Sequence, residues 1–454
     1  MSVSRRRAFV GIEKAAMAMV LLALFWVPLP VASDRDWALG ILLILLSVAG
    51  VLWALMELLP TSSRYPELEQ EWFKLGYIGL AMLLLLLLVQ LWVGAQWLFG
   101  VTERPSMTAQ YLMLGLGLSL LFFLLLQLFF TRKRLNILLA TLVFSGVFQA
   151  FYGTAMMMSG IEYLLGVAKT ESHGSATGTF ENRNHLAGYL EMTIALAIGW
   201  LLALRSGERF DMRALLDYLS GPKMRIRLGL VVMVVALVTT HSRMGNIAFF
   251  ASLMVVGLIF ILLQKENRLR NSLLLVSFVV IDIVIISQFF GLERLQERLL
   301  AMPIAMEQGA LLIDATDLRS LAVEQMLPMI ADNPFLGVGA GAFEYGFVRY
   351  AGEGFWSYFY HAHNDVLQFI AELGWLAFLF LVGFVGLALW QALRALANTQ
   401  SRYRSGIGFG AAMAIIALML HSLVDFNLQM PANAMTFVTV CAIAVLANRH
   451  YRHE

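Results

Sequence analysis

Six of the eight histidines in this chain lie at the ends of apolar segments, next to polar or charged side chains. These histidines are His173, His185, His241, His361, His363 and His421. Arg183 and Arg243 each lie within two residues of a member of this set. Histidine exchanges a proton near neutral pH, whereas arginine keeps its positive charge. A cluster of both residue types would suit proton transfer on an anionic substrate, provided that the fold brings them together.

The first motif covers residues 178–190 and reads GTFENRNHLAGYL, at the predicted start of an apolar helix. Free backbone N–H groups at a helix start favour an anion, and Arg183 adds a fixed charge with forked donors that suit a phosphate. The alternative is an ordinary helix start, in which Asn182 or Asn184 caps the helix and Arg183 reaches lipid headgroups. His185 lies one residue further along the same turn.

The second motif covers residues 239–246 and reads TTHSRMGN, between two apolar runs. Arg243 lies in the short turn that connects these runs. Its charge is therefore near the membrane boundary and requires a partner. A charged residue in this position is by default a candidate for a functional role. The alternative is an arginine that anchors the chain to a lipid phosphate.

The third motif covers residues 361–374 and reads HAHNDVLQFIAELG. His361 and His363 precede a predicted helix whose first turn holds Asn364 and Asp365. Either histidine could act as a general base whose tautomer is fixed by a neighbouring amide or carboxylate. Two histidines separated by one residue also suggest a metal site, but no compact set of carboxylates or cysteines completes the ligands. We therefore favour the base and predict no metal.

The fourth motif covers residues 421–431, HSLVDFNLQMP, and closes a predicted span. His421 ends the apolar run, and Asp425 could orient a histidine of another motif. The alternative is a capped helix end followed by an ordinary turn.

The composition is that of a polytopic helical membrane protein. Of the 454 residues, 60% are hydrophobic and 14% are charged, and the mean hydropathy is +0.75. Apolar runs of about 20 residues, long enough to cross a hydrocarbon core, recur along the chain. With Cys441 as its single cysteine, the chain can form no intramolecular disulfide. We predict about twelve spans, at about 14–33, 37–60, 73–94, 107–131, 135–159, 185–204, 228–241, 244–263, 272–290, 364–390, 406–422 and 430–447.

Loop charges predict that both termini lie in the cytoplasm. With the N-terminus inside, most lysines and arginines fall in inside segments, including the basic loop at 205–227, as the positive-inside rule requires. We treat the first span as a retained anchor rather than a signal peptide, because no clear small-residue cleavage site follows it. The four motifs then all open on the outer side of the membrane.

The largest extramembrane segment is predicted on the outer side, at about 291–363, between the ninth and tenth spans. It contains an amphipathic helix at 292–300, a second helix at about 318–331 and an aromatic run at 355–360, which suits either the membrane interface or sugar rings. We divide the chain into spans 1–5 (1–160), spans 6–9 with both arginines (161–290), the outer segment (291–363) and spans 10–12 (364–454).

Taken together, the motifs resemble those of the O-antigen ligase and polymerase superfamily of bacterial envelope glycosyltransferases. The resemblance is carried by residues 178–190, by Ser242 to Gly245, by His361 to Asn364 with Glu372 to Gly374, and by His421 to Asn427. It covers about 170–435, including the long outer segment. Residues 1–160 match only as a series of spans.

The resemblance implies a GT-C-like helical fold and a metal-independent glycosyltransferase or ligase of the bacterial inner membrane. Such an enzyme moves a glycan from an undecaprenyl-diphosphate carrier to a hydroxyl of a glycolipid, a glycan or a protein at the periplasmic face. It implies that Arg183 and Arg243 bind the diphosphate and that His363, or else His361, is the base. The other candidate substrate-binding residues are Asn182, Asn184, His185, Asn364, His421 and Asp425. It implies no cofactor and no nucleic acid partner, and a single displacement would invert the anomeric carbon.

Two alternatives remain at this point. A polysaccharide polymerase of the same superfamily would share the donor site and differ in its acceptor. A transporter or flippase for a lipid-linked sugar is the rival from another class, and it predicts polar residues deep inside the spans. Here the polar residues gather at the outer boundary, and Asp282 is the main acidic residue within a span.

Overall fold

The protein is an all-α polytopic membrane protein, as its composition predicted. The structure, a computed structural model, describes residues 3–58, 76–204, 221–263, 276, 315–351 and 359–449. Ten helices in these ranges are long and apolar enough to cross a membrane. The only strands described are the two residues each of β1 (Tyr163–Leu164) and β2 (Val167–Ala168), which form a small antiparallel hairpin.

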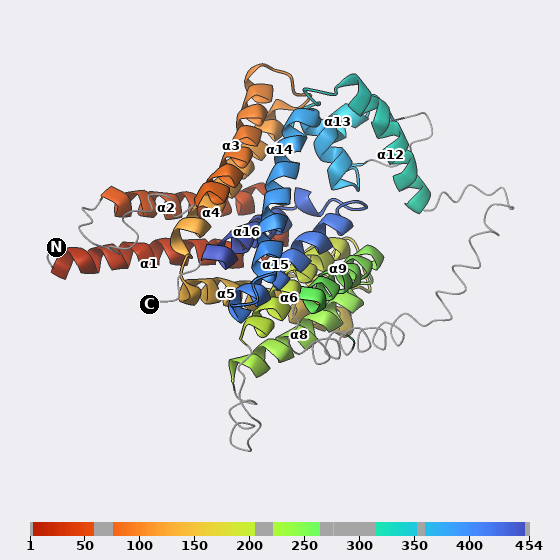
Figure 1. Cartoon of the computed structure of the whole chain (residues 1–454). Helices are drawn as coiled ribbons and strands as arrows, with labels where there is room; N and C mark the ends of the chain where they lie inside the picture. Colours follow the sequence, from red (N-terminus) through yellow and green to blue (C-terminus); the bar gives the residue numbers. More distant parts are fainter. Residues whose placement is uncertain are drawn as a thin grey trace.

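The described helices follow one another along the chain, with the β-hairpin between α5 and α6 (Figure 1). In chain order they are α1 (Val3–Trp26), η1 (Val31–Ser33), α2 (Asp36–Leu58), α3 (Gly76–Leu98), α4 (Pro105–Leu128), α5 (Arg132–Ser159), α6 (Arg183–Ala203), α8 (Pro222–Thr239), α9 (Arg243–Leu263), α12 (Ala315–Asp332), α13 (Phe343–Phe347), α14 (Asp365–Leu396), α15 (Arg402–His421), η2 (Asn427–Gln429) and α16 (Pro431–Arg449).

Among the predicted spans that differ in their bounds from the helices found are the first and the seventh. The first, predicted at 14–33, ends at Trp26, because Pro28 and Pro30 lack the N–H groups that would continue the helix. The seventh, predicted at 228–241, begins instead at Pro222. Its first turns therefore carry basic residues that we had assigned to the 205–227 loop, and α8 is not among the ten candidate spans.

Helix α12 confirms the second helix predicted in the outer segment, at about 318–331. The predicted ninth span at 272–290, the amphipathic helix at 292–300 and Asp282 lie outside the described residues. The same holds for residues 205–220 of the basic loop and for 355–358 of the aromatic run.

Helix α16 lies at the centre of the bundle, in contact with α4, α6, α14 and α15 (Figure 1). Its residues from Pro431 to Ala447 are all buried. Helices α6 and α15 pack closely because glycines face each other, and a β-carbon on Gly199 would lie 2.6 Å from the Gly406 carbonyl oxygen. Small residues at a helix contact let backbones approach, which strengthens packing in a membrane. This contact holds the first and fourth motifs in register.

Helix α14 is broken at Gly374, whose φ of 73° and ψ of 168° are not helical. The break leaves backbone carbonyl groups without helical partners. Other segments satisfy these groups: Val338 N–H donates to the Ala371 carbonyl oxygen at 3.0 Å, and Trp92 Nε1 donates to that of Leu373 at 2.8 Å. The break thus attaches the glycine-rich turns at 337–341 to the start of α14.

Candidate functional site

The four motifs meet at one end of the bundle, which we call the site end, and Asp425 lies at their centre. Its carboxylate accepts a hydrogen bond from Asn184 Nδ2 at 2.5 Å. Its Oδ1 lies 3.9 Å from His185 Nε2 and 3.8 Å from His363 Nδ1. The first, third and fourth motifs, which are far apart in the chain, therefore share one carboxylate.

The Asp425 side chain is 2% exposed, yet it is surrounded by groups that favour its charged form. Burial by itself raises the pKa of a carboxyl group. The interaction with His363, together with the positive potential of two further histidines, outweighs burial and holds the pKa of Asp425 well below its usual range. The carboxylate therefore remains an anion at the centre of the site.

Three histidine rings surround Phe426. His361 stacks on it with ring centroids 4.5 Å apart and planes 23° apart, while His185 and His363 meet it edge-on at 4.6 Å and 4.8 Å. The ring holds the three imidazoles in fixed orientations without offering a hydrogen bond that competes with Asp425. Sequence reasoning did not assign Phe426 a role, although it follows Asp425 directly.

His363 and His361 are both partly exposed and differ in their partners. The His363 side chain is 22% exposed, and its φ of 50° lies in the left-handed region, where a residue with a β-carbon is strained. His361 pairs through Nδ1 with Gln368 Nε2 at 3.1 Å. Burial lowers the pKa of His361 to about 3. His361 is therefore a neutral, weak base that is held by Gln368, whereas His363 faces Asp425.

The residues after His363 fix the start of α14. The Asn364 side chain caps the helix by accepting a hydrogen bond from Leu367 N–H at 3.0 Å. Asp365 accepts hydrogen bonds from Ser422 Oγ at 2.8 Å and from Leu428 N–H at 2.9 Å. These bonds tie the third motif to the fourth and set the position of His363 relative to Asp425.

Arg183 and Arg243 are exposed at the rim of the same cluster. His241, at the turn between α8 and α9, has its pKa lowered by burial and by the charge of Arg183. Its Nδ1 lies 3.2 Å from Ser175 Oγ, and Arg243 follows two residues later. The two arginines are therefore at the site end, beside the histidines rather than among them.

The first motif was interpreted either as a binding site or as an ordinary helix start, and its residues divide between these two roles. Asn182 caps α6, with its Oδ1 accepting from Asn184 N–H at 2.8 Å. The Asn184 side chain instead binds Asp425, so it belongs to the site. His173 lies apart from Asp425, where its Nδ1 contacts a Glu162 carboxylate oxygen at the β-hairpin.

Sequence reasoning missed Glu191, which is buried in α6 directly after the last residue of the first motif. Its Oε1 lies 2.8 Å from His421 Nδ1, and both side chains are fully buried. Glu191 in α6 and Glu372 in α14 are thus acidic residues within helices besides Asp282, which lies outside the described residues. A carboxylate inside an apolar run was itself the signal, because such a charge requires a partner.

Glu372 has a structural role within the third motif. Its carboxylate accepts hydrogen bonds from Gly341 N–H at 3.0 Å, from Phe343 N–H at 3.3 Å and from Gln368 Nε2 at 3.0 Å. Glu372 therefore connects the start of α13 to Gln368, the residue that pairs with His361. Within the ranges that the structure describes, no group of three or more histidines, cysteines and carboxylates is arranged to hold a metal ion.

The fold and this cluster define a class: a polytopic helical membrane protein with a histidine, carboxylate and arginine site at one end of its bundle. Residues 228–382 match the family model described as O-antigen ligase. The predicted resemblance to the O-antigen ligase superfamily is therefore confirmed for this part of the chain. The match includes Arg243, His361 and His363 but ends before the fourth motif. No curated protein matches the chain.

Proposed function

We propose that the protein is a glycosyltransferase that moves a glycan from undecaprenyl diphosphate to an acceptor hydroxyl at the periplasmic face of the bacterial inner membrane. The observation that supports this most strongly is the placement of His363 against Asp425, whose carboxylate also binds Asn184, the neighbour of Arg183. A base, an anion that orients it and two fixed cations are the groups that such a transfer requires.

In the proposed step, the acceptor oxygen attacks the anomeric carbon of the donor sugar. The new C–O bond forms as the bond to the diphosphate oxygen breaks, and its electron pair leaves with undecaprenyl diphosphate. The acceptor proton passes to His363 Nε2 while Nδ1 faces Asp425 at 3.8 Å. A single displacement of this kind inverts the configuration of the sugar, and a positioned base typically contributes about 10² to 10⁴ in rate.

Arg183 and Arg243 serve the leaving group. Negative charge develops on the diphosphate as the glycosidic bond breaks, and fixed guanidinium groups stabilise that charge without reorganisation and without a metal ion. Their exposure at the rim leaves them accessible to a headgroup at the membrane boundary. Burial among histidines would instead have shielded them from the carrier.

His363 is the better base of the two histidines. Its side chain is 22% exposed, and its Nδ1 faces Asp425 at 3.8 Å without a hydrogen-bond partner among the described residues. His361 is engaged by Gln368, and burial lowers its pKa to about 3, which makes it a poor proton acceptor near neutral pH. In this proposal, His361 and His185 hold Phe426 and the carboxylate in place.

The proposal is tested with purified protein in liposomes that contain an undecaprenyl-diphosphate-linked glycan. We expect Arg183→Ala and Arg243→Ala to weaken donor binding by about 10- to 100-fold, because each removes a hydrogen bond between charged groups. We expect His363→Ala to abolish release of undecaprenyl diphosphate while donor binding persists. Arg402→Ala, an exposed arginine at the other end of the bundle, is the matched control. Normal turnover in all three site variants would exclude the proposal.

Profiling the surface glycans of a deletion strain would separate the acceptors. Loss of lipopolysaccharide ladders indicates a ligase, loss of a free polysaccharide indicates a polymerase, and loss of protein glycans indicates a protein acceptor. A transporter predicts that lipid-linked glycan accumulates on the inner leaflet instead. The enclosed histidine cluster on one carboxylate favours transfer over transport.

A further inference from the structure

Three arginines line a polar cavity of about 420 Å³ at the end of the bundle opposite to the site end. Arg394 lies in the last turn of α14, Arg404 in the first turn of α15 and Arg449 at the last position of α16. The other ends of these three helices carry or adjoin the third and fourth motifs. Three separate helices therefore bring a cation to one space, far along each helix from the candidate site.

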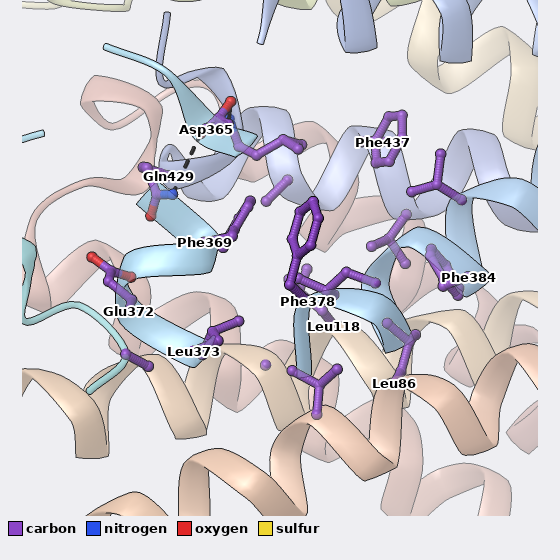
Figure 2. A pocket seen from close by; sticks show the side chains of 18 of the residues that line it. Leu86, Leu118, Asp365, Phe369, Glu372, Leu373, Phe378, Phe384, Gln429 and Phe437 are labelled. Carbon is purple, nitrogen blue, oxygen red and sulfur yellow. Dashed lines mark hydrogen bonds between the residues drawn. The ribbon is translucent and has the colours of Figure 1, made fainter. Parts of the chain in front are cut away.

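The two ends of α14 carry opposite charges. Figure 2 shows Asp365 and Glu372 in the first turns of this helix, where Gln429 Nε2 donates to Asp365 Oδ1 at 3.4 Å. The last turn carries Arg394 instead. An anion from outside the protein is therefore repelled at one end of α14 and attracted at the other.

The lining of the cavity is cationic and rich in amides. Its other members are two apolar residues and three amides: Ile78, Ala397, Gln391, Asn398 and Asn448. No carboxylate is thus among the described residues that line it. Guanidinium groups donate forked hydrogen bonds that match the oxygens of a phosphate. The cavity is also in the size range of small-ligand pockets, so it can hold a phosphate with further atoms attached.

Two of the amides indicate which further atoms these are. Asn398 Oδ1 accepts a hydrogen bond from Ser401 N–H at 2.9 Å, so its Nδ2 is the atom suited to a phosphate oxygen. Asn448 Nδ2 donates to the Gln391 carbonyl oxygen at 2.7 Å and to its Oε1 at 2.9 Å. The remaining amide atom of Asn448, its Oδ1, is suited to accept from a hydroxyl. The lining therefore fits a molecule that carries both a phosphate and a hydroxyl.

Exposed aromatic residues beside the cavity favour a lipid over a soluble phosphate. Trp390, 47% exposed, lies one turn before Arg394, whose guanidinium carbon is 5.7 Å from the centroid of its ring. Tyr77, 86% exposed, directly precedes Ile78 of the lining. Exposed tryptophan and tyrosine at the ends of membrane helices are typical of the interface between headgroups and acyl chains. The cavity therefore lies at the level where a lipid headgroup would enter it.

We propose that this cavity binds the headgroup of an anionic phospholipid that carries a hydroxyl, as phosphatidylglycerol does. The arginines and Asn398 bind the phosphate, and the headgroup hydroxyl donates to Asn448 Oδ1. The bound lipid joins the ends of α14, α15 and α16 and stabilises their packing. The assignment does not depend on the proposed function, since it concerns the other end of the bundle.

The ligand class is tested with the whole protein, purified in detergent and stripped of lipid. We expect one phosphatidylglycerol to stay bound in native mass spectrometry and the midpoint of thermal unfolding to rise with its concentration, because a ligand of the folded state stabilises it. Phosphatidylcholine, whose headgroup is neutral overall, should raise the midpoint much less. An equal rise with inorganic phosphate would overturn the lipid assignment, because the cavity would then hold a soluble anion. The absence of any rise would exclude an anion site.

Substitutions locate the bound lipid. We expect the double variant Arg394→Ala with Arg404→Ala to bind phosphatidylglycerol about 10- to 100-fold more weakly, because it loses hydrogen bonds between charged groups. Arg402→Ala, at an exposed position of the same turn of α15 but outside the lining, is the matched control and should bind normally. Normal binding by the double alanine variant would overturn the proposal.

A lysine pair keeps the test valid if the alanine variant fails to fold. Arg394→Lys with Arg404→Lys retains both charges but not the forked donors, so we expect it to unfold at the normal temperature without lipid and to bind phosphatidylglycerol more weakly. Binding equal to that of the unaltered protein would contradict the assigned arginine contacts. Neither measurement uses glycan transfer, so each outcome is separate from the test of the proposed function.

Discussion

At the scale of single residues, the site depends on one buried anion and its neighbours. Asp425 contacts Asn184 and faces His185 and His363, and Phe426 holds the rings around it. The separations of 3.8 and 3.9 Å are longer than hydrogen bonds, which is common in sites that tighten when substrate binds. The carboxylate is thus the residue whose charge most directly affects the proposed base.

Replacing Asp425 with asparagine tests this role. Asp425→Asn keeps the shape and the contact with Asn184 but removes the negative charge that orients His363. We expect kcat to fall by about 10²-fold or more, while KM for the donor changes little. Steady-state kinetics at several donor concentrations give both values. An unchanged kcat would show that Asp425 has only a structural role.

The pH dependence separates the two histidines of the third motif. Because burial lowers the pKa of His361 to about 3, protonation of its ring begins only below about pH 4, and the ring stays neutral throughout the assay range of about pH 5 to 8. We expect His361→Asn to reduce the maximal rate without moving the acidic limb of the kcat profile. A shift of that limb would mean that His361 titrates in this range and is the base.

At the scale of elements, the break in α14 positions the third motif. The residues before Gly374 carry His361 and His363 at their start, and those after it continue as a long membrane helix. The carbonyl groups exposed by the break bind the turns at 337–341, and the Glu372 carboxylate binds the start of α13. The motif around Glu372 and Gly374 is therefore a joint between the outer segment and the bundle.

Substituting the glycine at the break should destabilise the protein. A β-carbon on Gly374 would lie 2.1 Å from the Phe335 carbonyl oxygen, and its φ of 73° is unfavourable for other residues. We expect Gly374→Ala to lower the free energy of unfolding by about 1–3 kcal/mol or more and to reduce activity. Thermal unfolding in detergent measures the first effect. Gly386→Ala, in the same helix with open space around it, should leave stability unchanged or raise it.

At the scale of the whole molecule, the two ends of the bundle differ in their chemistry. The site end holds the histidines and Asp425. At the opposite end Arg394, Arg404 and Arg449 line a polar cavity of about 420 Å³. A basic end agrees with the cytoplasmic side that the loop charges predict, and it supports the proposal that the site faces the periplasm.

Accessibility of engineered cysteines tests this orientation. Cys441 is buried, so a Cys441→Ala background leaves a single reactive thiol for each variant. We expect Leu423→Cys, 48% exposed at the site end, to react with a membrane-impermeant maleimide in intact spheroplasts. Thr399→Cys, exposed at the opposite end, should react only after the membrane is opened. The reverse pattern would invert the proposed topology.

The sequence by itself determined the fold class and most helices, because runs of about 20 apolar residues have few alternatives to crossing a membrane. It also identified most residues of the candidate site, though not Phe426 or Glu191, since charged and titratable groups at the ends of such runs stand out from their surroundings. The sequence could not show which side chains contact each other, because Asp425 meets His185 and His363 through side-by-side packing of helices that are distant in the chain.

Only the tertiary structure decided which groups act together. The Glu191 and His421 pair and the packing of three histidine rings on Phe426 both depend on how α6, α14 and α15 are rotated against each other. That rotation is set by close glycine contacts and by the break at Gly374, which local hydropathy does not reveal. The basic cavity at the opposite end also depends on helix packing, because three helices contribute its arginines.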